Sequence, residues 1–181
     1  MKDSIRLFAA AMIPPAVKAQ LLALQQSFQH PNIRFMPEQN LHLTLYFIGN
    51  VPLAQLPSIQ EHIGQVVQQQ RPFTLTLNCL ETGPNSKAPR LVWARFQRNE
   101  AFELLSHQLA EALAPEPVKQ QKAIPHITMA RFRKDTLKPL ALPPVYPDAP
   151  VELSVTAVGL WKSELASPHP VYSVLQSYAF S

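Results

Sequence analysis

The stretch HLTLYFIG, His42–Gly49, decides the fold because the chain contains a second version of it, HITMARFR, at His126–Arg133. In both stretches, histidine and threonine alternate with apolar residues. Successive side chains on a β-strand point to opposite faces. Each stretch therefore predicts a strand with one polar face, which carries an imidazole and a hydroxyl, and one apolar face, which anchors the strand in the core.

The two polar faces consist of His42 with Thr44 and His126 with Thr128. We expect these four side chains to line one cleft. The residues between and after them should be buried away from the cleft: Leu43, Leu45, Ile127 and Met129.

The two histidine strands belong to a longer repeat. His126 follows His42 by 84 residues, and RLVWARF, which begins at Arg90, follows RLFAAAM, which begins at Arg6, by the same 84 residues. Each half of the chain thus reads as a strand, a helix and a histidine strand in constant register. This repeat predicts two related β-α-β lobes within a single domain, residues 1–181. A pseudo-twofold axis between the lobes would bring the two polar faces together.

Apolar periodicity predicts the remaining elements. The predicted strands are Ile5–Met12, Leu41–Ile48, Phe73–Leu80, Arg90–Phe96, His126–Phe132, Val151–Leu160 and Val171–Ala179. The predicted helices run from Pro14 to about His30, from Pro52 to Gln70 and from Asn99 to Leu113. The proline-rich segment 132–151 indicates an extended surface connection.

Composition and charge favour a folded protein with an anionic partner. Hydrophobic residues make up 46% of the chain, and the formal net charge is +4. Positive charge gathers around His126, from Lys119 and Lys122 to Arg131, Arg133 and Lys134, with no acidic residue in this stretch. The early apolar run is too short and too interrupted for a signal peptide, and no segment approaches the roughly 20 apolar residues that span a bilayer. We expect a cytoplasmic protein that does not insert into membranes.

Two imidazoles in one cleft suit acid-base chemistry at phosphorus. A free histidine titrates near pH 6.5, so one ring can accept a proton while the other donates one. Displacement at phosphorus needs both functions, for the attacking water and for the departing oxygen. The threonines would hold the non-bridging oxygens. The pattern does not predict a metal site, because neither motif contains a carboxylate and Cys79 is the only cysteine. The other histidines are interpreted as structural: His30, His62, His107 and His169.

Two further residues of the motif strands are weaker candidates. Tyr46 has the same parity as His42 and is either a base-stacking ring or an ordinary half-buried tyrosine. Strict alternation places Arg131 on the apolar side, so it reaches the cleft only if the strand ends or bulges before it.

Taken together, the two motifs and their flanks resemble the 2H phosphoesterases, and within them the bacterial and archaeal RNA 2',3'-cyclic phosphodiesterases, formerly called 2'-5' RNA ligases. The matching segments are RLFAAAMIPP, NLHLTLYFIGNV, RLVWARF, PHITMARF and VYSVLQSYAF. The resemblance implies a bilobal α+β fold in which two antiparallel-rich sheets enclose a central cleft, with helices outside. Two departures are visible, because Met129 stands where leucine is usual and Asn50 where an acidic residue is usual.

The resemblance also implies a function. The expected reaction is metal-independent hydrolysis of a terminal RNA 2',3'-cyclic phosphate to a 2'-phosphomonoester by a monomer with no cofactor and no obligate protein partner. His42 would be the proton donor to the 3' oxygen and His126 the acceptor that activates water. Thr44, Thr128 and Arg131 would bind phosphate.

Three alternatives stay open at this stage. The same site could ligate RNA ends as a 2'-5' RNA ligase, since ligation and hydrolysis share a transition state. It could instead act on a small cyclic nucleotide. The chain could also be a non-catalytic protein that binds RNA ends, with the histidines serving only as hydrogen-bonding groups for phosphate.

Overall fold

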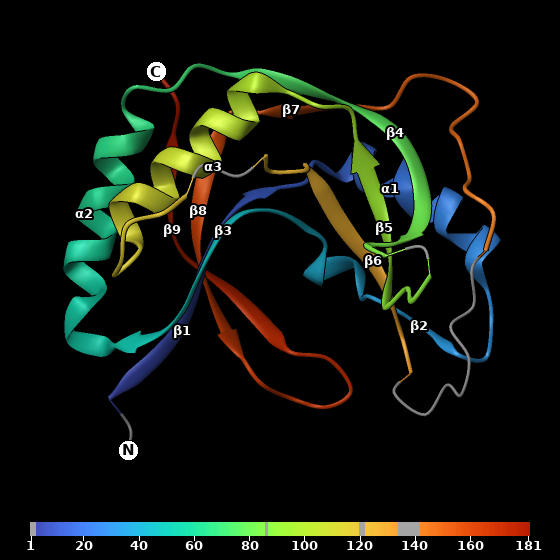
Figure 1. Cartoon of the computed structure of the whole chain (residues 1–181), viewed down its shortest axis with the longest axis horizontal. Coiled ribbons are helices and arrows are strands. Elements are labelled where there is room, and N and C mark those ends of the chain that lie inside the picture. Colours follow the sequence, from blue (N-terminus) through green and yellow to red (C-terminus); the bar gives the residue numbers. More distant parts are fainter. Residues whose placement is uncertain (1–2, 86, 120–121, 134–141) are drawn as a thin grey trace.

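The computed structural model describes residues 3–85, 87–119, 122–133 and 142–181 (Figure 1). Their strands form two antiparallel sheets with the orders β3-β1-β8-β9 and β2-β6-β5-β4-β7. The bounds are β1 Ser4–Met12, β2 Ile33–Phe35, β3 His42–Pro52, β4 Phe73–Gly83, β5 Leu91–Phe96, β6 His126–Phe132, β7 Glu152–Val155, β8 Ala157–Glu164 and β9 Val171–Ala179. The predicted α+β class with two sheets is confirmed.

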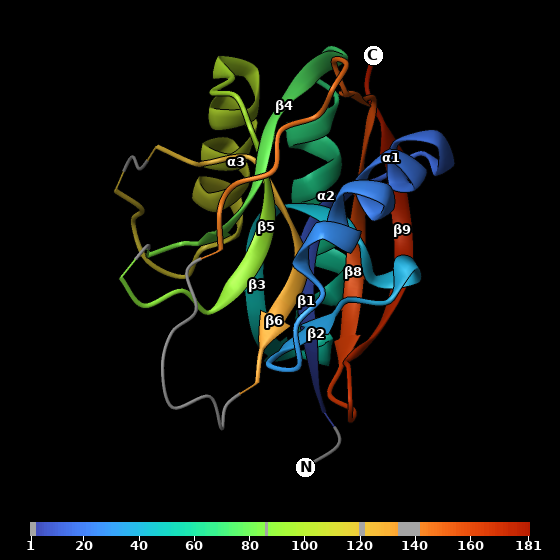
Figure 2. The same cartoon turned by 90° about the vertical axis from the view of Figure 1, so that its right-hand side faces the viewer.

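The internal repeat is visible in the order of the strands. In one sheet β3 lies beside β1, followed by β8 and β9, and in the other β6 lies beside β5, followed by β4 and β7. The two histidine strands, β3 and β6, therefore occupy equivalent places in their sheets. They also contact each other, as the view from the side of the second sheet indicates (Figure 2). The two predicted β-α-β lobes thus meet along their histidine strands.

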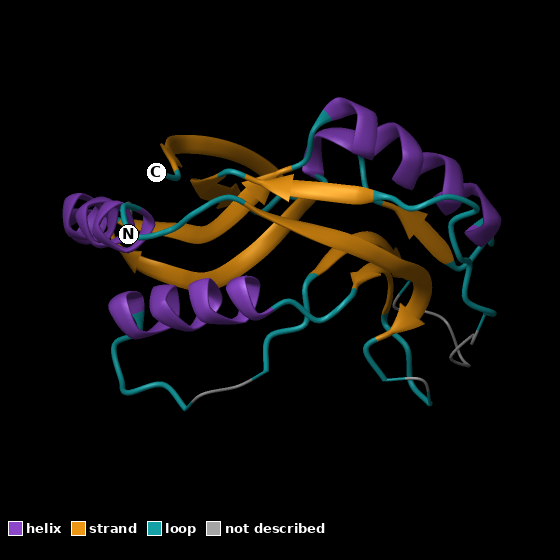
Figure 3. Ribbon diagram, turned by 90° about the horizontal axis from the view of Figure 1, so that it is seen from above, coloured by secondary structure: helices purple, strands orange, loops and turns teal. Residues whose placement is uncertain are grey.

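The helices lie outside the strands (Figure 3). Their bounds are α1 Pro15–Gln25, α2 Leu56–Val67 and α3 Glu100–Leu113. Asn99 caps α3, because its side chain accepts a 2.9 Å hydrogen bond from the backbone N–H of Phe102. Short 3₁₀ turns follow α1 and precede β3 and α2, at Gln26–Phe28, Glu38–Asn40 and Leu53–Gln55. Among the described helices, none has the length and apolar character needed to cross a membrane.

Two elements differ from the prediction. The single strand predicted at Val151–Leu160 is wrong, because the chain leaves one sheet after Val155 and enters the other at Ala157. The carbonyl of Thr156, between them, accepts a 2.8 Å hydrogen bond from the N–H of Phe180. The short strand β2 was not predicted. Most of the proline-rich connection, residues 134–141, lies outside the described residues, and the rest pairs with the second sheet through a bridge between Val145 and Leu80.

The main core fills the space between the sheets and the helices. It buries the apolar residues of both motifs, with exposed fractions of 0% for Leu43, Ile127 and Met129 and 4% for Leu45. The predicted burial of these four side chains is confirmed. A smaller cluster of Phe8, Ala10 and Trp161 lies on the opposite face of the first sheet, which is the face that carries the imidazole of β3.

Candidate active site

A cavity of about 170 Å³ lies where β3 and β6 meet. Of the predicted site residues, the cavity is lined by His42 and Thr44 from β3 and by Thr128 and Arg131 from β6. His126 does not line the cavity itself. It precedes Thr128 by two residues on the same face of β6, and its charge lowers the pKa of His42. The cleft therefore brings together the four motif side chains and adds an arginine.

Both imidazoles are fixed in the same way. The Nδ1 atom of His42 lies 2.7 Å from the carbonyl oxygen of Asn40, and that of His126 lies 2.7 Å from the carbonyl oxygen of Ile124. A carbonyl oxygen only accepts, so Nδ1 must donate in both rings. The Nε2 atom of each neutral ring then has a free lone pair, and it is the nitrogen available for proton transfer.

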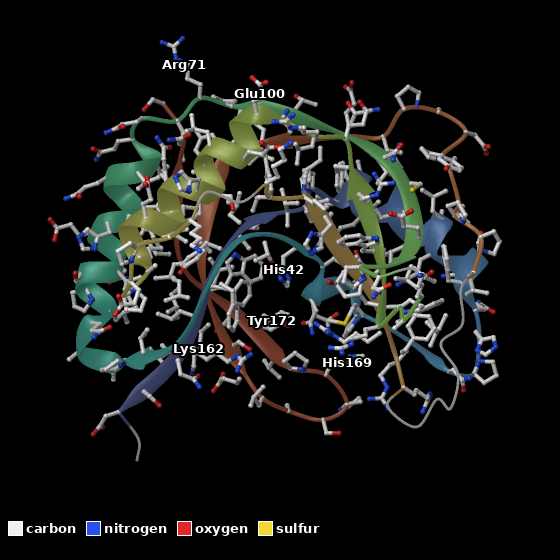
Figure 4. All side chains as sticks on the ribbon, in the orientation of Figure 1. His42, Arg71, Glu100, Lys162, His169 and Tyr172 are labelled. Carbon is white, nitrogen blue, oxygen red and sulfur yellow. The ribbon has the colours of Figure 1, made fainter. Side chains whose placement is uncertain are left out.

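The ring of His42 is enclosed by aromatic side chains. Its centroid lies 4.8 Å from that of Phe8, 5.2 Å from that of Tyr172 and 5.7 Å from that of Trp161. Figure 4 shows His42 and Tyr172 close together near the centre of the molecule. Burial in these surroundings also raises the pKa of the Tyr172 hydroxyl.

An indole also supports His126. Its ring centroid lies 4.9 Å from that of Trp93. Trp93 lies directly over Gly83, where an added Cβ would come within 2.7 Å of the indole nitrogen. Trp161 lies over Gly159 with the same 2.7 Å clearance. Each catalytic candidate thus packs against a tryptophan for which a glycine leaves room.

The protonation of His42 is set by its surroundings. Burial lowers its pKa to about 4, and the positive charges of His126 and Arg131 act in the same direction, against the hydrogen bond to the Asn40 carbonyl. The unliganded ring is therefore neutral at neutral pH. No carboxylate is among the described residues that line the cavity, which leaves its positive charges available for an anion.

The low pKa of His42 should make the folded state sensitive to acid. The pKa is lower in the folded chain than in the unfolded chain, so the unfolded chain takes up the proton first as the pH falls below about 6.5. Stability is then lost progressively down to about pH 4, by about 3 kcal/mol. Urea denaturation at several pH values should show that His42→Asn removes most of this loss. His62→Asn, a change on the exposed face of α2, should behave as wild type; equal acid sensitivity of all three proteins would contradict the expectation.

Both histidine strands bulge at the fourth residue of their motif. On β3, Thr44 pairs with Ala10 and Tyr46 pairs with Ala9, which leaves Leu45 without a partner. On β6, Thr128 pairs with Trp93 and Ala130 pairs with Val92, which leaves Met129 unpaired. A bulge adds one residue and reverses the side-chain alternation beyond it.

The bulges decide which later residues reach the cleft. Beyond Met129 the alternation is reversed, so Arg131 lies on the cleft side and lines the cavity. Beyond Leu45 the same reversal turns Tyr46 to the main core. The predicted cleft position of Tyr46 is therefore wrong. Phe47, which is 50% exposed, lines the cavity instead, and the guanidinium carbon of Arg6 lies 4.9 Å from its ring centroid.

A helix side chain caps the carbonyl of each bulged residue. The amide of Gln25, at the end of α1, donates a 2.6 Å hydrogen bond to the carbonyl of Met129. The hydroxyl of Ser106, on α3, donates a 2.6 Å hydrogen bond to the carbonyl of Leu45. The helix of each lobe therefore stabilises the bulge in the histidine strand of the other lobe.

Removing the Gln25 cap should weaken the site as well as the fold. Gln25 is 2% exposed, and Gln25→Met keeps its shape but removes the donor. Loss of a buried hydrogen bond costs about 1–3 kcal/mol. The expected result is a lower free energy of unfolding together with weaker phosphate binding, because the bulge that positions Arg131 loses its support. Gln26→Met is the matched control on the exposed neighbour; equal effects of the two substitutions in urea denaturation would contradict this role.

Several site residues carried no signal in the sequence. Asn40 is buried, and besides holding His42 through its carbonyl it donates a 2.8 Å hydrogen bond from its side chain to the carbonyl of Pro170. Tyr172 and Phe47 reach the cavity from strands whose faces could be assigned only with the bulges known. His169 was interpreted as structural, but it lines a second cavity. No group of three or more potential metal ligands occurs among the described residues.

Comparisons with known proteins agree with this geometry. The RNA 2',3'-cyclic phosphodiesterase of Thermus thermophilus is 31% identical over 184 residues, which cover 97% of this chain and 90% of the relative. The crystal structure of TT0787 of Thermus thermophilus matches with a TM-score of 0.83 at 30% identity, over 97% of this chain and 98% of that one. The crystal structure of E. coli LigT complexed with 3'-AMP matches with a TM-score of 0.80 at 26% identity, over 99% of both chains.

The family assignment follows from a match over most of the sequence. The model of the 2'-5' RNA ligase superfamily matches residues 13–166. These residues include both histidine motifs, their bulges and the arginine that follows the second bulge. The resemblance drawn from the two motifs is confirmed: the chain belongs to the 2'-5' RNA ligase superfamily.

Proposed function

We propose that this protein is an RNA 2',3'-cyclic phosphodiesterase that opens a terminal 2',3'-cyclic phosphate to a 2'-phosphomonoester. The observation that carries the proposal is the pair of imidazoles, His42 and His126, each with Nδ1 bonded to a main-chain carbonyl, beside a cavity lined by two threonines and an arginine. The Thermus thermophilus relative carries this name. E. coli LigT has been crystallised with 3'-AMP, a nucleotide with its phosphate on the ribose 3' oxygen.

In the proposed reaction the two imidazoles act on opposite ends of an in-line displacement. Nε2 of His126 takes a proton from water as the water oxygen bonds to phosphorus. The bond from phosphorus to the 3' oxygen breaks, and Nε2 of His42 gives a proton to that oxygen. The product carries a 2'-phosphate and a free 3' hydroxyl. Proton exchange with solvent then restores His42 and His126 to their starting states.

The donor role requires the substrate to change the protonation of His42. In the unliganded site its pKa of about 4 keeps the ring neutral. A phosphate diester adds a negative charge beside the ring and offsets the positive charges of Arg131 and His126, so binding should raise this pKa. The NMR titration of His42 with inorganic phosphate bound should show this rise. An unchanged value would assign the acceptor role, and not the donor role, to His42.

The other cavity residues would hold the phosphate. The hydroxyls of Thr44 and Thr128 line the cavity from β3 and β6 and can donate to the two non-bridging oxygens. The Arg131 guanidinium lines it too and can bind the phosphate with two parallel hydrogen bonds. Together these groups would stabilise the charge that develops on the oxygens in the transition state.

The product of the reaction tests the proposal directly. The protein is incubated in EDTA with an oligonucleotide that ends in a 2',3'-cyclic phosphate, and the product is identified by phosphorus NMR. The expected product is the 2'-phosphomonoester. A 3'-phosphate, or activity that EDTA abolishes and zinc restores, would contradict the mechanism. RNA binding without turnover at any pH would instead identify a protein that only binds RNA ends, and joining of RNA ends in place of hydrolysis would identify a ligase.

A further inference from the structure

A second cavity, of about 360 Å³, adjoins the candidate active site. It is lined by Arg34 from β2, by Arg131 and Phe132 from β6, by Met36, and by Pro168 and His169 from the loop between β8 and β9. Met36 and Arg131 line both cavities. The two cavities are therefore neighbours with a common wall, and one guanidinium faces both.

The second cavity concentrates positive charge. Arg34 and Arg131 are direct partners across the β2–β6 pair, so their side chains stand on the same face of the sheet. Like charges directly opposite each other destabilise a sheet. The pKa of His169 is lowered by burial and then by the charges of Arg34 and Arg131, which places all three groups within electrostatic reach of one another. No carboxylate is among the described residues that line this cavity.

The loop that carries His169 is held in place from both sides. Arg34 donates a 3.2 Å hydrogen bond to the carbonyl of Pro168, and the side chain of Asn40 donates a 2.8 Å hydrogen bond to the carbonyl of Pro170. Asn40 is also the residue whose carbonyl holds His42. In Figure 4, His169 lies beyond Tyr172 from His42. The second cavity is thus fixed relative to the catalytic imidazole.

The sizes of the two cavities indicate how they divide a ligand. Pockets that hold a small organic ligand have volumes of about 300–1,000 Å³. The catalytic cavity, at about 170 Å³, is below this range, and the second, at about 360 Å³, is within it. Guanidinium groups recognise phosphate oxygens, and the apolar surfaces of Met36 and Phe132 suit the uncharged parts of a nucleotide. Consecutive phosphates of an RNA chain are separated by a single ribose, so two adjoining anion sites match two consecutive phosphates.

We propose that the second cavity binds the phosphate on the 5' oxygen of the terminal nucleotide, which in RNA is the last internucleotide phosphate. Arg34 and His169 are its specific contacts, and Arg131 bridges it to the cyclic phosphate. This inference rests on the proposed function and makes it more specific. The site selects the end of a nucleotide chain over a free nucleoside 2',3'-cyclic phosphate.

Three substrates separate this contribution from catalysis. Adenosine 2',3'-cyclic phosphate lacks a 5'-phosphate. Its 5'-phosphorylated form and the dinucleotide ApA 2',3'-cyclic phosphate both have one. The expected kcat/KM is about tenfold or more higher for the latter two, since a hydrogen bond to a charged group contributes at least about that factor. A dinucleotide with an uncharged methylphosphonate linkage should lose the advantage, because it keeps the second nucleoside but not the charge.

Two variants assign the advantage to the second cavity. Arg34→Gln and His169→Gln should each lower the ratio of kcat/KM between the 5'-phosphorylated and the unphosphorylated substrate. Arg71→Gln is the matched control, because Arg71 is exposed and lies at the far end of the molecule from His169 (Figure 4). It removes one positive charge from the chain without touching the cavity, so the ratio should stay at the wild-type value.

The outcomes distinguish this inference from the proposed function. Turnover of all three natural-backbone substrates with equal kcat/KM would overturn the second phosphate site and leave the phosphodiesterase activity standing. A 5'-phosphate advantage that Arg34→Gln and His169→Gln leave intact would place the second phosphate elsewhere and overturn this assignment. Absence of turnover on every cyclic phosphate would overturn the proposed function itself.

Discussion

Replacing either His42 or His126 with alanine should lower kcat for an RNA 2',3'-cyclic phosphate about 10²- to 10⁴-fold, because each variant loses one of the two proton transfers. Neither ring belongs to the main core, so the fold should persist. The measurements are initial rates on one cyclic phosphate substrate, with near-UV circular dichroism as the check on folding.

The double variant tests whether the two rings act together. Because both serve a single displacement, the loss in His42→Ala/His126→Ala should be well below the product of the single losses. His62→Ala is the control for the loss of a histidine from the surface of α2. A folded His126→Ala variant with wild-type turnover would exclude His126 from the chemistry.

Arg131→Gln should have the second largest effect, a loss of about 10²- to 10³-fold in kcat, which is typical when one fixed donor to a developing oxyanion is removed. Arg131 lines both cavities, so the loss should extend to substrates with and without a 5'-phosphate. Arg131→Lys should recover only part of the rate, because an ammonium group cannot form two parallel hydrogen bonds.

Arg71→Gln again controls for net charge, and phosphate affinity separates binding from chemistry. Arg131→Gln should weaken binding of inorganic phosphate, followed through the histidine signals in NMR, while Arg71→Gln should not. Normal turnover in Arg131→Gln would show that the threonines and the imidazoles hold the phosphate without it.

The sequence predicted the two motif strands and their faces because alternation is a local property. His42 and Thr44 required only the period of a β-strand, and so did His126 and Thr128. The 84-residue repeat placed the two strands in equivalent positions. These predictions depend on short stretches of sequence and on no distant contact.

The faces beyond the fourth motif residue could not be predicted, because a bulge depends on distant partners. The bulge at Met129 is capped by Gln25, and the bulge at Leu45 is capped by Ser106. Gln25 lies 104 positions from its partner and Ser106 lies 61 positions from its partner. Strict alternation therefore placed Tyr46 on the cleft side and excluded Arg131, and the fold reversed both.

The second cavity was equally hidden in the sequence. Its members come from β2, from the end of β6 and from the loop after β8, and no local pattern connects them. His169 was interpreted as structural because a single histidine among prolines has no periodic context. Only the pairing of β2 with β6 brings Arg34 opposite Arg131 and gives the loop a charged neighbour.

The central claim, that His42 donates a proton to the leaving 3' oxygen and His126 activates water, is tested most directly with a changed leaving group. The substrate is a nucleoside 2',3'-cyclic phosphate with sulfur in place of the 3' oxygen. A thiol is far more acidic than an alcohol, so the sulfur can depart without a proton donor. On this substrate His42→Ala should regain most of the wild-type rate while His126→Ala remains inactive. Recovery of His126→Ala alone would reverse the two roles, and recovery of neither would contradict general acid catalysis by these histidines.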